Sequence, residues 1–288
     1  MPNLSNPAVI REILSRHGFH FSKALGQNFI INPSVCPKMA EMAGAAPVVG
    51  VIEIGTGVGV LTAELASRAD KVVAIELDKR LLPVLEETLA DYHNIRVINE
   101  DVLKVDLQSV IDEEFAGMDV IVCANLPYYI TSPILMALLE QHLPIRSITV
   151  MVQKEAAQRI TALPGTRAAG AISLAVRYYS EPQVLFSVSR GSFLPAPDVD
   201  SAVIRLDLLE HPPIEIHEES CFFKVVKASF SQRRKTLSNS LASGLSIPKQ
   251  QAAQLLETAG IPANARAEQL SMEQFGTLAN AYYETDRK

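Results

Sequence analysis

The spacing of hydrophobic residues changes along the chain, and this change predicts the order of its elements. Isolated apolar residues at helical spacing follow Asn6-Pro7, and a second Asn-Pro pair stands at Asn32-Pro33. Because asparagine caps a helix and proline fits its first turn, we expect helices to begin at both pairs. They should end at Gly18 and near Gly44. Residues 24–30 follow neither period, so we expect a loop there.

From residue 48 onward, short apolar runs alternate with helical stretches. The runs predict strands at residues 49–54, 71–76, 95–98, 118–124 and 145–152. Helices are expected between them at residues 60–69, 79–92 and 132–141. Such alternation is typical of a parallel sheet covered by helices on both faces. Two more runs, at 183–188 and 201–208, predict an antiparallel pair that closes the sheet.

The strand pattern ends after residue 208. Helices are expected beyond it at residues 218–230, 236–242, 249–259 and 272–283. We therefore place a domain boundary near residue 209. The pattern predicts an α/β domain over residues 1–208, with an N-terminal helical extension, and a smaller all-α C-terminal domain over residues 209–288.

Composition narrows the class of protein. The 288 residues are 48% apolar and 20% charged, which is typical of a packed globular chain and excludes a disordered or coiled-coil protein. No apolar run reaches the roughly 18 residues that a membrane helix needs, and the first residues do not resemble a signal peptide. We expect a cytoplasmic location, no membrane contact and no metal site. No heptad pattern or apolar stripe indicates an oligomer, so a monomer is expected.

A glycine-rich turn follows the first strand of the predicted sheet. Gly55, Gly57 and Gly59 have neither the spacing of the dinucleotide fingerprint nor the lysine of a P-loop. Glu76 ends the next strand, where an ionised carboxylate can accept both hydroxyls of a ribose. Asp101 follows the third strand, where it can accept an adenine amine.

Each of these features alone is also typical of a tight turn or a solvated strand end. Their order on successive strand ends, without a basic phosphate clamp, favours a nucleoside ligand. S-adenosyl-L-methionine is the common ligand of that kind.

The chemistry is predicted from Asn125-Leu126-Pro127-Tyr128, which follows the fourth strand. An exocyclic adenine amine is a poor nucleophile because its lone pair is delocalised into the ring. The Asn125 side chain and the Leu126 carbonyl could accept its two N–H bonds and aim the lone pair at a methyl carbon, while Tyr128 offers a stacking face. The alternative is a turn that only ends a strand.

At this point the sequence resembles the ribosomal RNA small-subunit adenine N6,N6-dimethyltransferase family, the bacterial 16S rRNA dimethyladenosine transferases. Six segments carry the resemblance besides Glu76 and Asp101: residues 25–29, 53–59, 125–128, 152–159, 193–201 and 230–237. The resemblance implies a Rossmann-like class I methyltransferase sheet followed by a small helical domain. It also implies S-adenosyl-L-methionine as the cofactor.

The resemblance assigns roles to particular residues. The implied cofactor-binding residues are Asn28, Ile30, Gly55, Glu76, Asp101 and Asn125. The implied catalytic residues are Asn125, Leu126 and Tyr128. Phe193 would give the target adenine a second stacking face. The family usually has leucine at Ile30, a change that keeps the volume, and an acid at Asn32.

The partner implied by the resemblance is small-subunit ribosomal RNA within a 30S assembly particle, methylated during ribosome biogenesis. A net charge of −6 argues against nucleic acid unless basic residues gather locally. Arg233, Arg234 and Lys235 form the one tight basic run and are the expected RNA contacts, although such a run is often only a solvated helix start. Two alternatives stay open: a large-subunit rRNA methylase of the antibiotic-resistance type, and a non-catalytic RNA-binding assembly factor.

Overall fold

The computed structural model describes residues 4–22, 25–232 and 234–286. The chain divides into two compact units. The first, which we call the sheet unit, comprises Met1–Ala157 and Pro182–Leu208, and the second, the helical unit, comprises Gln158–Glu181 and Leu209–Lys288. The division of the chain at residue 209 stays a prediction, and the excursion of residues 158–181 into the helical unit has no counterpart in the sequence pattern.

A seven-stranded sheet forms the centre of the sheet unit. Its strands, in spatial order, are β4 (Ile95–Ile98), β3 (Lys71–Ile75), β2 (Val49–Ile54), β5 (Asp119–Asn125), β6 (Ser147–Gln153), β9 (Ser201–Leu208) and β7 (Ser180–Val188). The first five strands pair in parallel, and β9 runs antiparallel to β6. This arrangement confirms the predicted α/β fold.

The register of the parallel strands brings their carboxyl ends to one edge. Ile54 lies opposite both Ile75 and Ala124, and Ile75 lies opposite Ile98. The residues that follow these four strands must therefore start at nearly the same height. In an open α/β sheet, that edge is where ligands bind.

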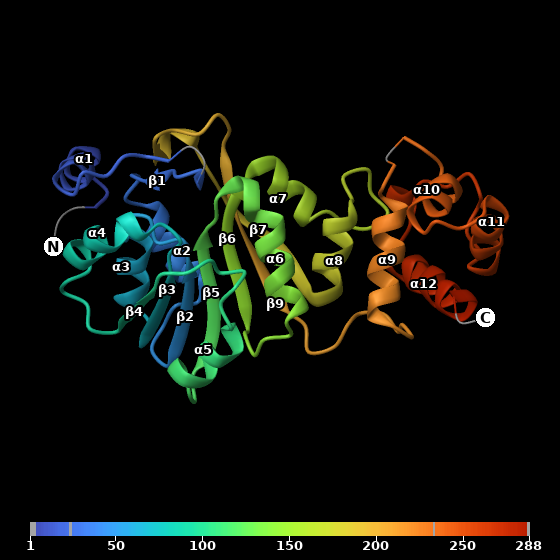
Figure 1. Ribbon diagram of the computed structural model, residues 1–288, viewed down its shortest axis with the longest axis horizontal. Helices are drawn as coiled ribbons and strands as arrows, with labels where there is room; N and C mark the ends of the chain where they lie inside the picture. The colour runs from blue at the N-terminus through green and yellow to red at the C-terminus, as the bar shows by residue number, and fades with distance from the viewer. Residues whose placement is uncertain (1–3, 23–24, 233, 287–288) are drawn as a thin grey trace. The chain divides into compact units, whose positions relative to one another are not determined.

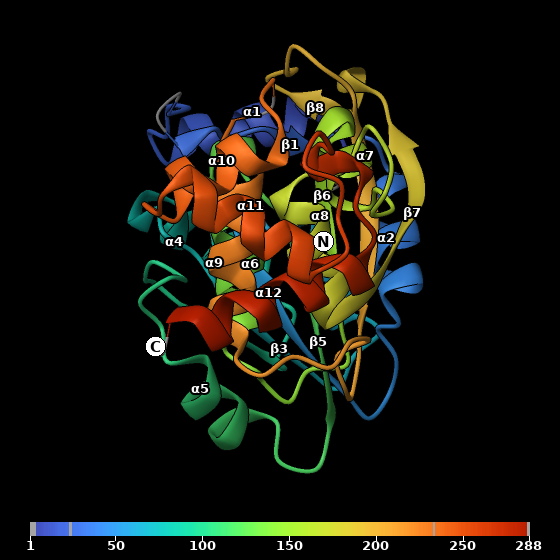
Figure 2. The same ribbon diagram turned by 90° about the vertical axis from the view of Figure 1, so that its right-hand side faces the viewer.

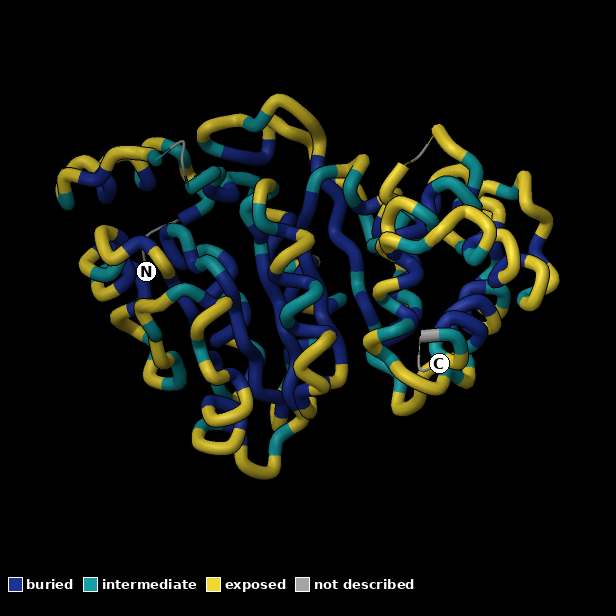
Figure 3. The backbone as a smooth tube through the Cα atoms, turned by 45° about the vertical axis from the view of Figure 1, so that its right-hand side comes forward, coloured by how far each residue is buried: buried dark blue, intermediate teal, exposed yellow. Residues whose placement is uncertain are grey.

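Helices cover both faces of this sheet. In Figures 1 and 2, α2 (Val35–Ala43) and α6 (Thr131–Glu140) lie on opposite sides of the strands. All six residues of β2 are buried, and Figure 3 shows the central strands as a buried layer with exposed positions mainly on helices and loops. Continuous burial explains why these strands have apolar residues at every position instead of an alternating pattern.

Helix starts follow the expected capping chemistry. The Asn6 side chain accepts a hydrogen bond from the Ala8 amide, and Pro7 opens α1 (Pro7–Arg16). The second start is displaced: Asn32 accepts from the Ser34 amide, and α2 begins at Val35. Asn32 therefore orders the turn before the helix instead of capping the helix itself.

The prediction of a loop over residues 24–30 is wrong at the C-terminal end of that segment. Phe29–Ile30 form a short strand, β1, which pairs antiparallel with β8 (Phe193–Leu194). The partner lies more than 160 residues away in sequence, so local periodicity could not reveal it. The predicted helix at 79–92 is also shorter, because a 3₁₀ turn at Lys79–Leu81 precedes α4 (Leu82–Thr88).

Some helices were not expected from the sequence. They are α5 (Leu107–Glu114), α7 (Lys154–Ile160) and α8 (Ala171–Tyr179). One expected helix, at residues 60–69, is present as α3 (Val60–Ala66). None of the helices among the described residues is long and apolar enough to cross a membrane.

The four helices expected beyond residue 209 are confirmed. They are α9 (Glu219–Ser229), α10 (Leu237–Gly244), α11 (Lys249–Thr258) and α12 (Met272–Asp286). Within the helical unit, the ring of Tyr178 on α8 stacks on Phe222 of α9, with 5.1 Å between centroids. These rings help to join residues 158–181 to the C-terminal helices.

Candidate functional site

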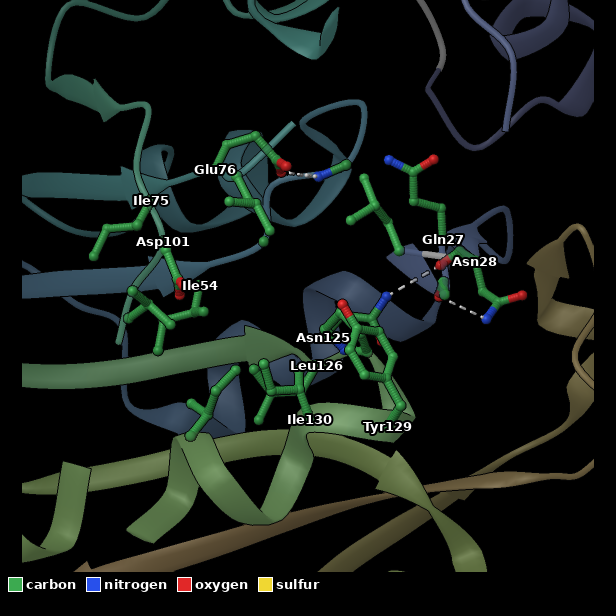
Figure 4. Close-up of a pocket in the computed structure, with 18 of the residues that line it drawn as sticks. Gln27, Asn28, Ile54, Ile75, Glu76, Asp101, Asn125, Leu126, Tyr129 and Ile130 are labelled. Atoms are coloured by element: carbon green, nitrogen blue, oxygen red, sulfur yellow. Dashed lines mark hydrogen bonds between the residues drawn. The ribbon is translucent and has the colours of Figure 1, made fainter. Parts of the chain in front are cut away.

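A cleft opens at the carboxyl edge of the sheet. It holds about 880 Å³ of empty space, part of it open to solvent. Its walls come from the ends of β2, β3 and β5, the turn after β4, and the loop before β1 (Figure 4). The cleft brings together most of the residues predicted for the site, namely Asn28, Gly55, Glu76, Asp101, Asn125, Leu126 and Tyr128.

The glycine turn and Glu76 form one hydrogen-bonded unit. One Glu76 carboxylate oxygen accepts hydrogen bonds from the Thr56 amide and hydroxyl, both at 2.9 Å, and the other accepts from the Asp78 amide at 2.8 Å. Burial raises the pKa of Glu76, and these hydrogen bonds oppose the rise. The carboxylate is therefore fixed in orientation and keeps lone pairs that can accept ribose hydroxyls.

Only glycine suits the backbone of this turn. Gly55 and Gly57 have φ values of +78° and +56°, which L-residues with side chains rarely adopt. A Cβ on Gly57 would also stand 3.0 Å from the Phe29 ring. The turn can thus pass close to both a ligand and β1.

Asp101 lines the cleft from the turn that follows β4 and is partly buried. One of its oxygens accepts a hydrogen bond from the Leu103 amide at 3.1 Å, and its own amide donates to the Glu100 side chain. Ile54, Ile75, Leu77 and Val102 line the same cleft. These apolar side chains form a surface on which the adenine ring of a ligand could lie, beside the Asp101 carboxylate as hydrogen-bond acceptor. The sequence motifs did not identify them. The sequence feature that could have identified them is that they stand close in sequence to Glu53, Glu76 or Asp101.

Asn125 ends β5 and faces the loop that carries Asn28. Its side-chain amide donates to the main-chain carbonyl of Asn28 at 3.2 Å, and the Asn28 side chain donates to the Gly26 carbonyl at 3.1 Å (Figure 4). The first bond fixes which end of the Asn125 amide is the donor, so its side-chain oxygen is left as an acceptor toward the cleft.

Two adjacent tyrosines of the same segment have different surroundings. The Tyr128 hydroxyl lies 2.6 Å from Ser201 Oγ, and burial raises the pKa of this phenol. Tyr129 is 59% exposed, and its ring points into the cleft toward Asn125 in Figure 4. A Cβ on Gly26 would stand 3.3 Å from that ring. The sequence analysis did not single out Tyr129.

Two residues predicted to contact the cofactor or the target base do not line the main cleft. Phe193 is 3% exposed and packs in the core of the sheet unit, so its role as a stacking face stays a prediction. Ile30 is also buried and lines a smaller neighbouring cavity of about 280 Å³. This cavity shares Gly55, Gly57 and Asn125 with the main cleft, which places Ile30 beside the expected cofactor site.

The predicted RNA contacts belong to the helical unit. Arg234 and Lys235 are exposed in the turn before α10. Arg233 lies outside the described residues. Their assignment to RNA binding stays a prediction.

Gln27 lies within the segment 25–29 that carries the resemblance, but the sequence assigned no role to it. Its amide nitrogen donates to Asp78 at 2.8 Å, and its oxygen accepts from the Ser22 amide. Arg80 holds the pKa of Asp78 below its usual range, so the acceptor is ionised. Gln27 thereby ties the loop before β1 to the segment that follows Glu76.

Comparison with known proteins shows the family to which the chain belongs. The family described as ribosomal RNA adenine dimethylase matches residues 18–284. The chain is 50% identical to "Ribosomal RNA small subunit methyltransferase A" of Geobacillus thermodenitrificans over 283 residues, covering 97% of both chains.

Solved structures show the same fold. The structure of the 23S rRNA methyltransferase ErmE aligns with a TM-score of 0.66 and 29% identity, covering 88% of this chain and 99% of ErmE. A dimethyladenosine transferase from Plasmodium falciparum aligns with a TM-score of 0.68 and 23% identity, covering 90% and 97%. The chain belongs to the ribosomal RNA adenine dimethylase family and is a methyltransferase of the class I, Rossmann-like fold.

Proposed function

We propose that this protein transfers methyl groups from S-adenosyl-L-methionine to N6 of two adjacent adenosines in 16S ribosomal RNA, giving N6,N6-dimethyladenosines during assembly of the small subunit. The proposal depends on one observation: Glu76, Asp101 and Asn125 line the same cleft at the carboxyl edge of the sheet. The 50% identity to a small-subunit methyltransferase over 97% of both chains supports the choice of substrate.

The residues of the cleft fit an adenosine-containing cofactor. Glu76 offers fixed carboxylate acceptors for the ribose hydroxyls, and Asp101 offers an acceptor for the adenine amine beside an apolar wall. Asn28 and Ile30 would line the methionine end of the cofactor, and Gly55 would lie beneath it. When bound, the cofactor supplies an electrophilic methyl group on a sulfonium centre.

The chain's own residues then align the nucleophile. The Asn125 side-chain oxygen and the Leu126 carbonyl accept the two N–H bonds of the target amine, so that its lone pair points along the line of methyl transfer. Tyr128, held through Ser201, stacks against the base. Positioning of this kind needs no covalent intermediate and supplies much of the acceleration of a displacement reaction.

The target base must leave its helix to reach Asn125. Bases are extruded or taken from unpaired RNA by enzymes that modify them. Structured RNA is recognised largely by shape, which lessens the need for surplus positive charge on a protein of net charge −6. Arg234 and Lys235 in the helical unit would contact RNA phosphates.

The large-subunit alternative has weaker support. The chain is 29% identical to the 23S rRNA methyltransferase ErmE, against 50% to the small-subunit relative. A non-catalytic assembly factor would not require the fixed arrangement of Glu76 and Asn125.

The test is transfer of labelled methyl groups to unmodified small subunits, large subunits and naked RNA, followed by nucleoside analysis. We expect dimethyladenosine with small-subunit substrate only. Label in large-subunit RNA would support the resistance-type alternative. Cofactor binding without any transfer would support the non-catalytic one.

A further inference from the structure

Residues 25–28, which we call the bridge segment, line the cleft and contact both of its functional parts. Tyr129, which lies where a target base would enter, and Glu76, the proposed ribose acceptor, line the same cleft. Of the bridge segment, only Asn28 has a role in the steps above. The contacts of Gly26 and Gln27 give the segment a further one.

On the side of the target base, the bridge segment packs against an exposed ring. A Cβ on Gly26 would stand 3.3 Å from the Tyr129 ring, and the φ of Gly26 is +58°, a left-handed conformation that favours glycine. The ring is otherwise open, with 59% of Tyr129 exposed, and it points into the cleft toward Asn125 (Figure 4). A base that stacks on Tyr129 would therefore fix a ring that already rests on the bridge segment.

On the side of the cofactor, hydrogen bonds hold the same segment to Asn125. The Gly26 carbonyl accepts a hydrogen bond from the Asn28 side chain at 3.1 Å. The Asn28 carbonyl accepts one from the Asn125 side chain at 3.2 Å. The position of Asn28 thus depends on the position of Gly26, the residue that Tyr129 contacts.

Gln27 connects the bridge segment to the ribose acceptor. Its side-chain amide donates to the Asp78 carboxylate at 2.8 Å, and the Asp78 amide donates to the Glu76 carboxylate at 2.8 Å. Asp78 is 6% exposed, and its two oxygens also accept from the Arg80 guanidinium. Displacement of the bridge segment would remove one donor from this buried carboxylate, which is costly.

We propose that the bridge segment couples the binding of RNA to the binding of the cofactor. Stacking of a base on Tyr129 and contact of the cofactor with Asn28 require the same arrangement of residues 25–28. Each ligand therefore stabilises the arrangement that the other one binds. Gln27 is a positioning residue that acts through Asp78 and Glu76. This inference rests on the proposed function and adds an energetic link between its two substrates.

The experiment is equilibrium binding of labelled S-adenosylhomocysteine, which has no methyl group to transfer, to the whole protein with and without saturating unmodified small subunits. We expect the particles to lower the dissociation constant by about fivefold or more, the usual range for coupled sites. S-adenosylhomocysteine should raise the affinity for particles by the same factor, because such coupling is reciprocal. The same dissociation constant with and without particles overturns the proposal.

The Tyr129 ring is tested by its effect on this coupling factor, which is a ratio that a general loss of affinity does not change. Tyr129→Ala should reduce the factor to about one at particle concentrations that saturate the variant, whereas Tyr129→Phe should retain it. Val184→Ala is the matched control, because it shortens another exposed side chain, on the edge strand β7. Full coupling in Tyr129→Ala would contradict the proposal.

Gln27 is tested by reversal of its hydrogen bond. Gln27→Glu sets a carboxylate against Asp78 and should weaken binding of S-adenosylhomocysteine about tenfold without particles, since hydrogen bonds to charged groups are strong. Adding Asp78→Asn supplies an amide donor to the new carboxylate and should restore most of the affinity. Unchanged affinity in Gln27→Glu, or no recovery in the double variant, would refute the role of Gln27.

The inference and the proposed function fail in different ways. Binding of S-adenosylhomocysteine and of particles without any coupling would overturn the inference alone. No binding of S-adenosylhomocysteine, or no binding of small subunits, would contradict the proposed function as well.

Discussion

At the scale of single residues, the site depends on side chains whose hydrogen bonds are already formed before a ligand binds. Glu76 is held by Thr56 and the Asp78 amide, and Asn125 by the Asn28 carbonyl. Because these side chains are already held in one orientation, ligand binding costs less of their conformational entropy. In the proposed function Glu76 holds the cofactor, whereas Asn125 lies between the cofactor and the target base and orients the amine, so their loss should have different effects.

Replacement of Asn125 should affect transfer and spare cofactor binding. Asn125→Ala removes the acceptor that orients the target amine, and loss of one such group costs about 10²–10³-fold in rate. The dissociation constant of S-adenosyl-L-methionine should change only a few-fold. Single-turnover methyl transfer and cofactor titration measure the two effects. Equal loss of both would refute the role given to Asn125.

Replacement of Glu76 should have the reverse pattern. Glu76→Ala removes the ribose acceptors, and hydrogen bonds to charged groups are worth about 1.5–3 kcal/mol, so cofactor affinity should fall by about 10- to 150-fold. Calorimetric titration measures the change, with circular dichroism as the control for folding. Unchanged affinity would remove Glu76 from the cofactor site.

The exposed ring of Tyr129 should matter for RNA. It points toward Asn125 and packs on Gly26, where an entering base would meet it. Stacking of a base on an aromatic ring is worth about 1–3 kcal/mol, so Tyr129→Ala should raise the KM for RNA by about tenfold, whereas Tyr129→Phe should retain most of the interaction. The same KM for both variants and wild type would show that the ring does not meet the substrate.

At the scale of elements, close packing of strands and helices sets the edge on which the site is built. Gly50 of β2 has no room for a side chain, because a Cβ there would stand 2.2 Å from the Phe115 ring at the end of α5. The strand and the aromatic ring touch directly. The position of β2 in turn fixes the glycine turn.

Gly50→Ala should therefore lower the free energy of unfolding by about 1–3 kcal/mol, the usual range for overpacking of a core. Gly191→Ala is the control, because its Cβ would have no neighbour nearer than 3.8 Å and its backbone is not left-handed. Urea denaturation of both variants measures the difference. Equal stability would contradict the packing described for β2.

Elements with strong local patterns were predictable from the sequence. The buried strands β2, β3 and β5 are continuous apolar runs, and α1 begins at its asparagine and proline. The pairing of β1 with β8 was not predictable, because two-residue strands have no period and the partner is remote. Helix α8 was missed, since the turns around residues 163–170 obscure its start.

Some residues of the candidate site were likewise predictable from the sequence and others were not. Glu76, Asp101 and Asn125 were found because strand ends of a parallel sheet share one edge. Tyr129 and Leu77 were not found, since only three-dimensional structure shows that they line the cleft.

At the scale of the whole molecule, the charge balance governs how the protein meets RNA. The chain has 26 basic and 32 acidic side chains, so any RNA-binding face must depend on local concentration of Lys and Arg. The exposed Arg234 and Lys235 precede α10 in the helical unit. These residues are the described part of the only tight basic run in the sequence.

Removal of both charges should weaken RNA binding in a salt-dependent way. Each phosphate contact contributes about one unit to the slope of log affinity against log salt, so Arg234→Gln with Lys235→Gln should reduce that slope by about 2. Lys249→Gln, an exposed lysine at the start of α11, is the control. An unchanged slope in the double variant would place the RNA face elsewhere.

Stability should depend on pH through Glu53. Its pKa is raised to about 8 in the folded chain, above the ordinary 4.5, so the folded state binds the extra proton. The stabilisation is complete below about pH 4.5 and is lost as pH rises through 8, because the unfolded carboxyl ionises first. Urea denaturation across this range should show a decline in unfolding free energy that Glu53→Gln reduces. A parallel decline in both proteins would contradict the assignment.

The proposed reaction is the dimethylation of two adjacent adenosines of small-subunit RNA in this cleft. The most direct measurement is mass spectrometry of nuclease fragments from small-subunit particles treated with S-adenosyl-L-methionine and either wild-type protein or Asn125→Ala. We expect one fragment with two methyl groups on each of two neighbouring adenosines for the wild type, and none for the variant. Methylation of isolated adenosines, of another nucleoside, or at the same level by Asn125→Ala would contradict it.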